Sequence, residues 1–331
     1  NPAFGHSGEA AISNYFIRGN GKEYQSQVSP EEWADLIHFE GNANALRVLT
    51  HAFAGKDPSG FALTYATLGA IIKYPCGAID GHKKGIHHLK KYGFFDSEKH
   101  TFEKVATELG VLKDPQQPSA YKRHPLVYLV EAADDICYNI IDLEDAHRLG
   151  ILRYEQVEQL LLPLCGGGME GRLQALADLD SRVSLLRAKA INTLIQACST
   201  LFLEEQERIL AGQFESALMD AIPENLQSAM REIARISVEK IYNAPSVIQI
   251  EVAGYKVMDG LLEEFIPAYL NKDKSPYDRK LLALIPSQFD TNGQSVYMRI
   301  RSVLDFVSGM TDLYAVELFR KIKGISFPTL D

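Results

Sequence analysis

Cysteine and long hydrophobic runs are scarce in this sequence. Four cysteines occur among 331 residues, at positions 76, 137, 165 and 198, and no two of them form a CxxC pair. Zinc-ribbon and thioredoxin-like motifs therefore lack support, and the low cysteine content is typical of a reducing compartment. No apolar run approaches the roughly 18 residues that a membrane-spanning helix needs. We expect a cytoplasmic protein that has no membrane partner.

Basic residues are also in the minority. The 34 lysines and arginines are outnumbered by 43 aspartates and glutamates, which gives a formal charge of −9. Because duplex contacts depend on Lys and Arg, general nucleic-acid binding is not indicated. A local basic stretch could still bind one small polyanion, or it could form a solvated loop. The densest such stretch lies between Lys73 and Lys91 and contains His82, Lys83, Lys84, His87, His88 and Lys90.

Alternation of the strand type is rare, whereas apolar residues recur with helical spacing through most of the chain. Helix starts are marked clearly, as at Ser29-Pro30, where two glutamates follow in the first turn. We predict an all-α protein with at most a short hairpin around residues 77–81. No Pro/Ser-rich linker divides the chain, so one compact domain over residues 1–331 is expected.

Three polar residues share one face of a helix predicted from Pro125 to Leu149. Asp134, Tyr138 and Asp142 follow the spacing i, i+4, i+8 and drift by only about 40° per step. Because their neighbours are largely apolar, we expect this helix to be buried, and a buried carboxylate is costly unless it is paired or bound to a metal. The pattern therefore indicates either a site or a solvated acidic stripe.

A histidine near the start of the chain stands between two glycines. His6 precedes a predicted helix, and Glu9 follows three residues later, within expected hydrogen-bond reach. Such a carboxylate raises the basicity of an imidazole and fixes its tautomer. A helix N-terminus also attracts phosphate. The alternative is a plain capping arrangement with Ser7 as the N-cap.

Residues 1–9, which read NPAFGHSGE, are the first of several blocks that occur in a recognisable order. The others are residues 39–43 (FEGNA) with Leu46-Arg47, residues 63–69 (LTYATLG) before residues 73–75 (KYP), residues 91–95 (KYGFF), the stretch from His124-Pro125 to residues 142–145 (DLED), and residues 309–312 (GMTD). Over most of the chain, these blocks resemble the dGTPase family of HD-domain deoxynucleoside triphosphate triphosphohydrolases.

The resemblance implies an HD-domain helical fold with extra C-terminal helices over roughly residues 170–331. It implies the metal-dependent hydrolysis of dGTP, or of a wider set of dNTPs, to a deoxynucleoside and inorganic triphosphate. It further implies a divalent cation, Mn²⁺ or Mg²⁺, and a homo-oligomer such as a hexamer. The family's first metal-binding His and its His-Asp pair would lie before Asn1, so we expect an N-terminal portion that this chain lacks.

The resemblance also implies roles for individual residues. Asp134 matches the last metal ligand, with Asp135 as the neighbouring alternative. Tyr138 and Asp142 would contact the deoxyribose, and His6 would act as general acid or base beside Glu9. The expected phosphate ligands are Lys73, Lys91 and His38, although a structural role for His38 is equally open. Arg299 and Arg301 could also reach a substrate.

Two other functions are compatible with the sequence. One is an HD phosphohydrolase that acts on other nucleotides, such as nucleoside monophosphates, which would not need the basic stretch. The other is a catalytically silent nucleotide-sensing protein, because most of the implied metal ligands are absent from the chain.

Overall fold

The computed structural model describes residues 2–52, 60–289 and 295–326. The described residues contain helices and no strands, apart from an isolated bridge between Lys113 and Tyr121, so the all-α prediction is confirmed. The prediction of a short hairpin around residues 77–81 was wrong. The backbone N–H groups of Asp80 and Gly81 both donate to the carbonyl of Gly77, at 3.1 and 3.2 Å, and close a tight turn there instead.

The chain folds as two compact units. Unit 1 combines residues 1–122 with residues 249–331, and unit 2 comprises residues 123–248. The expected C-terminal region, residues 170–331, is thus divided between them, and the single domain over 1–331 stays a prediction. The helices of unit 1 are α1 (Gly5–Ile17), α2 (Pro30–Ile37), α3 (Gly41–Thr50), α4 (Tyr65–Ile71), α5 (Lys99–Glu108), most of α12 (Pro245–Leu270), α13 (Pro276–Leu282), α14 (Val296–Ser308) and α15 (Asp312–Ile322).

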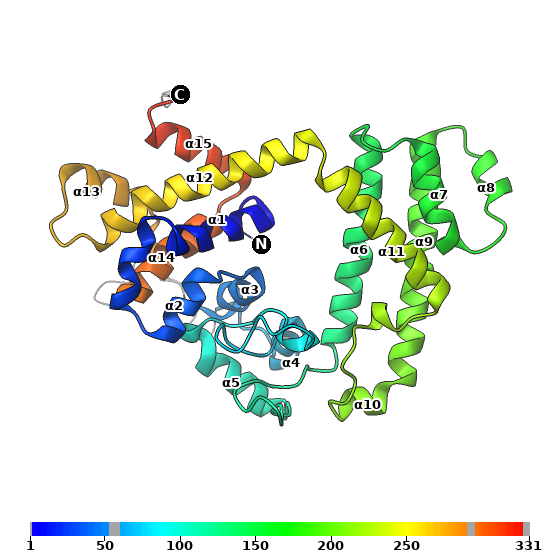
Figure 1. Cartoon of the computed structure of the whole chain (residues 1–331), viewed down its shortest axis with the longest axis horizontal. Coiled ribbons are helices and arrows are strands. Elements are labelled where there is room, and N and C mark those ends of the chain that lie inside the picture. Colours follow the sequence, from blue (N-terminus) through cyan, green and yellow to red (C-terminus); the bar gives the residue numbers. More distant parts are fainter. Residues whose placement is uncertain (1, 53–59, 290–294, 327–331) are drawn as a thin grey trace. The chain divides into compact units, whose positions relative to one another are not determined.

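The core of unit 1 joins segments that are far apart in the sequence. In Figure 1, α12 (yellow) runs beside α1 (blue) and α14 (orange). Their contact is apolar: Ile12 and Phe16 of α1 belong to one buried cluster with Phe265 of α12 and Leu304 of α14. Burial of such side chains contributes about 1.5–3 kcal/mol each, so the two ends of the chain stabilise one another.

A buried ion network fastens α3 to α14. Arg47 of α3 is fully buried, and its guanidinium donates to both carboxylate oxygens of Asp305 on α14, at 2.7 and 2.6 Å. Its remaining nitrogen donates to Glu98 at 2.6 Å. A bidentate pair of this kind is both strong and directional. It therefore fixes the position of α3 against α14 and compensates the buried charge of Arg47.

Arg301, for which contact with a substrate was one expectation, lies in the same interior. Its side chain is fully buried, and the guanidinium stacks 3.7 Å from the centre of the Phe95 ring. The expectation was therefore wrong for Arg301, because α14 turns this residue into the core of unit 1. Arg299 lies over the ring of Tyr269 and donates to that residue's backbone carbonyl.

Unit 2 is a separate helical bundle. Its helices are α6 (Val127–Arg148), α7 (Tyr154–Cys165), α8 (Glu170–Gln174), α9 (Leu179–Glu204), α10 (Gln206–Leu210), α11 (Glu224–Ile236) and the π-helical turn η5 (Ser237–Tyr242). The helix predicted from Pro125 to Leu149 is confirmed as α6. One face of α6, with Ile136, Ile140 and Leu143, packs into a core shared with α7 and α9.

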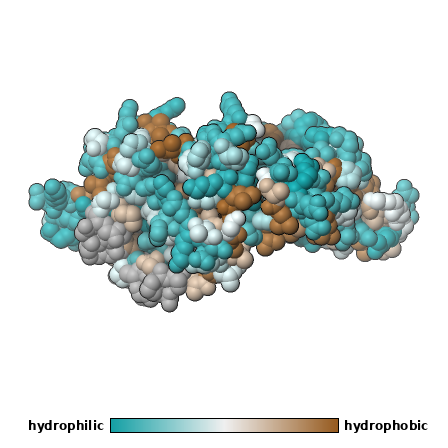
Figure 2. Space-filling view, turned by 90° about the horizontal axis from the view of Figure 1, so that it is seen from below, coloured by the Kyte–Doolittle hydropathy of each residue, from teal (hydrophilic) through white to brown (hydrophobic). Residues whose placement is uncertain are grey.

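The surface is predominantly hydrophilic on the face seen in Figure 2, with small hydrophobic patches between polar residues. Within the described ranges, no helix is long and apolar enough to cross a membrane. The exposed apolar side chains include Leu149 and Leu313, which are 72% and 70% exposed. These residues lie on different units.

Replacing Asp305 by Asn tests the ion network. The variant keeps the shape of the side chain but leaves the charge of Arg47 only partly compensated. We expect the free energy of unfolding to fall by roughly 3–5 kcal/mol, as is usual when one partner of a buried pair is lost. Urea unfolding followed by circular dichroism measures the change.

Asp273→Asn is the matched control, because this aspartate is exposed on the same unit. It should change stability by no more than about 0.5 kcal/mol. Equal stability of the two variants would show that the Arg47–Asp305 pair does not stabilise unit 1.

Candidate functional site

The first turn of α1 is fixed by the other end of the chain. The backbone N–H of Phe4 donates to the Asp312 carboxylate at 2.8 Å, at the start of α15. Gly8 allows the turn to close, since a Cβ at that position would lie 2.0 Å from the carbonyl oxygen of Ala3. The result is that His6 lies in the first turn of α1 with an exposed ring.

Glu9 lies one turn further along α1 and is 8% exposed. Its carboxylate accepts the backbone N–H of Gly41, at the start of α3, at 3.2 Å. Among the described residues no hydrogen bond joins it to His6, so the expected His6–Glu9 hydrogen bond was wrong: Glu9 is directed inward, to α3. Burial raises the pKa of Glu9, Glu40 raises it further, and the charges of Lys91 and His6 oppose both effects.

Glu40 connects Glu9 with the expected phosphate ligand Lys91. It is the N-cap residue of α3, is 5% exposed, and accepts from the Asn42 side chain at 2.7 Å. Lys91 donates to the same carboxylate oxygen at 3.1 Å. The lysine side chain is about one-third exposed, which leaves part of its ammonium group open to solvent or an anion.

Two histidine rings lie beside this pair. His38 ends α2, and its ring centre is 4.6 Å from that of His82, in the loop before Lys91. Both side chains are exposed, yet partial desolvation lowers the pKa of each ring. Glu40 opposes this change at His82, whereas Lys91 adds to it.

We call His6, Glu9, His38, Glu40, His82 and Lys91 the unit 1 cluster. It brings together four residues expected from the sequence. Glu40 and His82 are the additions that the sequence does not single out, although Glu40 lies in the FEGNA block and His82 in the basic stretch. Glu40 is distinguished by its hydrogen bonds with Asn42 and Lys91, and His82 by its ring contact with His38.

Other residues of the basic stretch have structural contacts. His88 is buried and lies 2.6 Å from the carboxylate of Asp114, and Lys83 donates to the side chain of Gln117. Lys73 lies just beyond the C-terminal end of α4, with an intermediate exposure. Its role as a phosphate ligand stays a prediction.

On unit 2, the sequence-predicted face of α6 is more exposed than expected. Asp134 is exposed and Tyr138 is 50% exposed, while Asp142 has an intermediate exposure. The expectation of a buried Asp134 was therefore wrong. The cause is the amphipathic helix: its core-facing side carries Ile136 and Ile140, and Asp134 lies on the opposite side.

A residue outside α6 contacts this face. Tyr242, at the end of the π-helical turn η5, donates to the Asp142 carboxylate at 2.6 Å, and its ring stacks on that of Tyr138 with 6.0 Å between the centres. We call Tyr138, Asp142 and Tyr242 the α6 trio. π-helical turns are rare and are often found at functional sites. Tyr242 could not be identified from the sequence, because it lies 100 residues beyond Asp142.

The described residues do not by themselves fit a metal centre. Nowhere in the described ranges do three or more His, Cys, Asp or Glu side chains gather in a way that could hold an ion. Asp134 would contribute one carboxylate, whereas a bound divalent ion takes about four to six ligands.

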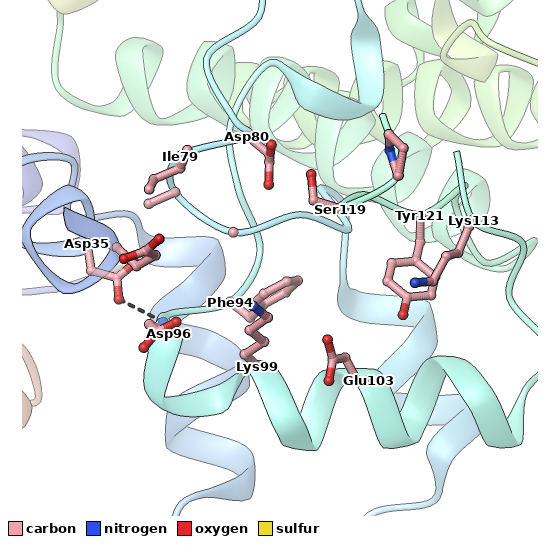
Figure 3. Close-up of a pocket in the computed structure, with 14 residues that line it drawn as sticks. Asp35, Ile79, Asp80, Phe94, Asp96, Lys99, Glu103, Lys113, Ser119 and Tyr121 are labelled. Atoms are coloured by element: carbon pink, nitrogen blue, oxygen red, sulfur yellow. Dashed lines mark hydrogen bonds between the residues drawn. The ribbon is translucent and has the colours of Figure 1, made fainter. Parts of the chain in front are cut away.

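A pocket elsewhere in unit 1 has a different character (Figure 3). Its volume is about 160 Å³, and none of the sequence-predicted site residues lines it. Five carboxylates face it but only two lysines, so it is poorly suited to a polyanion. Asp35 lies at one side, where burial raises its pKa to about 7 and it accepts the backbone N–H of Asp96 at 2.7 Å.

Comparison with known proteins agrees with the sequence blocks. A family model described as a phosphohydrolase-associated domain matches residues 221–321. A deoxyguanosinetriphosphate triphosphohydrolase-like protein of Pseudomonas aeruginosa is 37% identical, over 99% of this chain and 75% of its own length. Proteins of the same name from Synechocystis sp. and Listeria monocytogenes are 34% and 32% identical, each over 98% of this chain and 74% and 75% of their own lengths.

The hydrogen bond within the α6 trio gives a prediction that is independent of any activity. Burial raises the pKa of Asp142, and the donated hydrogen bond from Tyr242 lowers it. In Tyr242→Phe the stabilising donor is lost, so the pKa of Asp142 should rise further. Titration of the carboxyl ¹³C signals by NMR measures this shift. Tyr277→Phe, which removes a similar hydrogen bond to Glu264 on unit 1, should leave Asp142 unchanged; an unchanged Asp142 in Tyr242→Phe as well would contradict the assignment.

Proposed function

The chain belongs to the deoxyguanosinetriphosphate triphosphohydrolase-like proteins of the HD superfamily, and from this premise we propose that it hydrolyses dGTP or other dNTPs. The products are the deoxynucleoside and inorganic triphosphate. The observation that carries the proposal is the unit 1 cluster, in which an exposed histidine at a helix start lies near buried glutamates and a partly exposed lysine. The N–H groups of the exposed histidines and of Lys91 can donate to phosphoryl oxygens.

In this reaction the oxygen of a water molecule bonds to the α-phosphorus, and the bond from that phosphorus to the 5′-oxygen breaks. The leaving oxygen needs a proton, and the attacking water loses one. His6 is the group that we assign to this proton transfer, because its ring is exposed at the first turn of α1. Positioned acid–base groups contribute typically 10²- to 10⁴-fold to the rate.

Glu9 has a positioning role in this proposal. Its carboxylate holds the start of α3 through Gly41 and lies close enough for its charge to interact with that of His6. Lys91, His38 and Lys73 are the proposed ligands of the triphosphate.

We assign recognition of the deoxyribose to the α6 trio. Asp142 would accept a hydrogen bond from the 3′-hydroxyl, and the ring of Tyr138 would pack against the deoxyribose so that no room is left for a 2′-hydroxyl. Tyr242 supports both residues, because it donates to Asp142 and stacks on Tyr138. A site that packs closely at one carbon atom discriminates by steric exclusion.

Further parts of the proposal rest on membership of the family. They are a requirement for Mn²⁺ or Mg²⁺ with Asp134 as the ligand that this chain contributes, assembly into a homo-oligomer such as a hexamer, and a cytoplasmic location. The ion, when bound, would stabilise negative charge on the phosphate oxygens.

Product analysis tests the reaction. The intact protein is incubated with dGTP and Mn²⁺ or Mg²⁺, and the products are separated by ion exchange and identified by ³¹P NMR. We expect triphosphate and deoxyguanosine in equal amounts, and no hydrolysis of dGMP. Release of pyrophosphate or of single phosphate would refute the proposed reaction, and efficient hydrolysis of dGMP would favour the mononucleotidase alternative.

His6→Gln tests the proton-transfer role. The variant keeps a polar side chain but cannot exchange a proton near neutral pH, so kcat should fall by about 10²-fold or more. The matched control is His100→Gln, since His100 is an exposed histidine of α5 in the same unit. Wild-type kcat in His6→Gln would exclude this histidine from the chemistry.

A further inference from the structure

His82 is held in an unusual backbone conformation. Its φ is +62°, in the left-handed region that residues other than glycine rarely adopt. The preceding Gly81 permits this bend, because a Cβ there would lie 2.8 Å from the carbonyl oxygen of Lys91. Such conformations cost about 1–3 kcal/mol and are concentrated at functional sites.

The surrounding loop holds this bend in place. The backbone N–H of Lys83 donates to the carbonyl of Leu89 at 2.9 Å, and that of Gly93 donates to Cys76 at 3.0 Å. These bonds fold the loop back on itself and place His82 beside Tyr92, with 6.0 Å between the ring centres. The fold therefore holds the backbone of His82, and its exposed ring lies near the rings of His38 and Tyr92.

The two histidines carry little charge before a ligand arrives. Desolvation lowers the pKa of each ring below its usual value and so favours the neutral form. The charged groups that face them are Glu40, which raises the pKa of His82, and Lys91, which lowers it. Lys91 is itself paired with Glu40.

The cluster therefore has no large positive charge with which to attract a polyanion. The unit 1 cluster contains two glutamates, one lysine and three histidines. A triphosphate carries several negative charges, and its arrival beside two neutral imidazoles would favour their protonated forms. Two imidazolium rings only 4.6 Å apart would repel each other, so a single added proton is favoured over two.

We propose that His82 and His38 form a paired-imidazole binding site that takes up a proton together with the triphosphate group of the substrate. This inference rests on the proposed function and deepens it, since it adds His82 as a ligand and makes triphosphate binding depend on pH. The protonated pair donates N–H groups to phosphate oxygens, and the proton leaves again when the triphosphate is released.

Isothermal titration calorimetry with inorganic tripolyphosphate tests the proposal. The intact protein is titrated at pH 7 in two buffers that differ in their enthalpy of ionisation, which gives the number of protons taken up. The same titrations are made on the double variant His38→Gln/His82→Gln, which lacks both imidazoles, and on His100→Gln as the control. The probe's own protonation contributes equally to each protein, so the comparison between proteins isolates the imidazoles.

Wild type and His100→Gln should take up about one proton more than the double variant. Their affinity for tripolyphosphate should also rise as the pH falls from 8 to 6, by up to about tenfold per pH unit more than in the double variant. Circular dichroism should show the same helix content in all three proteins, because both rings are exposed.

Equal proton uptake by wild type and the double variant would overturn the proposal, as would the absence of tripolyphosphate binding to wild type. The release of triphosphate from dGTP, measured separately, distinguishes this failure from that of the proposed function. If release persists, the proposed function stands and only the role of the histidine pair is refuted.

Discussion

The contact of Arg47 with Asp305 and Glu98 is the constraint on which the unit 1 cluster depends. It joins α3 to α14 across 258 residues of sequence. Removing three charges from water is costly, and the bidentate geometry offsets that cost only while all partners are in place. Because α3 begins at Gly41, the same contact fixes the N-terminal end of α3, where Glu9 and Glu40 meet.

The N-terminal side of the cluster is positioned in a comparable way. Asp312 of α15 receives the backbone N–H of Phe4, two residues before His6. The conspicuous blocks of the sequence are therefore largely structural supports: GMTD holds the start of α1, FEGNA caps α3, and KYGFF supplies both Lys91 and the Phe95 ring beneath Arg301. An acidic protein can in this way build a local site for an anion without a large basic surface.

Local signals made much of this fold predictable. Ser29 caps α2 as the sequence indicates, and the helix predicted from Pro125 to Leu149 is present as α6 with bounds that differ by one or two residues. Features set by contacts distant in sequence were not predictable. The exposure of Asp134 depends on which side of α6 faces the core, and the partnership of Asp142 with Tyr242 depends on a π-helical turn that no propensity indicates. In the sequence, nothing distinguishes His82 from the other five basic residues of its stretch. Its contact with His38 depends on the bend at Gly81.

Binding of the triphosphate by the unit 1 cluster can be measured by hydrogen–deuterium exchange and mass spectrometry, with and without inorganic tripolyphosphate. We expect slower amide exchange in peptides that cover residues 38–42 and 81–92, and unchanged exchange in η5 and the segment of α6 around Tyr138. Slowing confined to unit 2, or no slowing in either segment of unit 1, would contradict it.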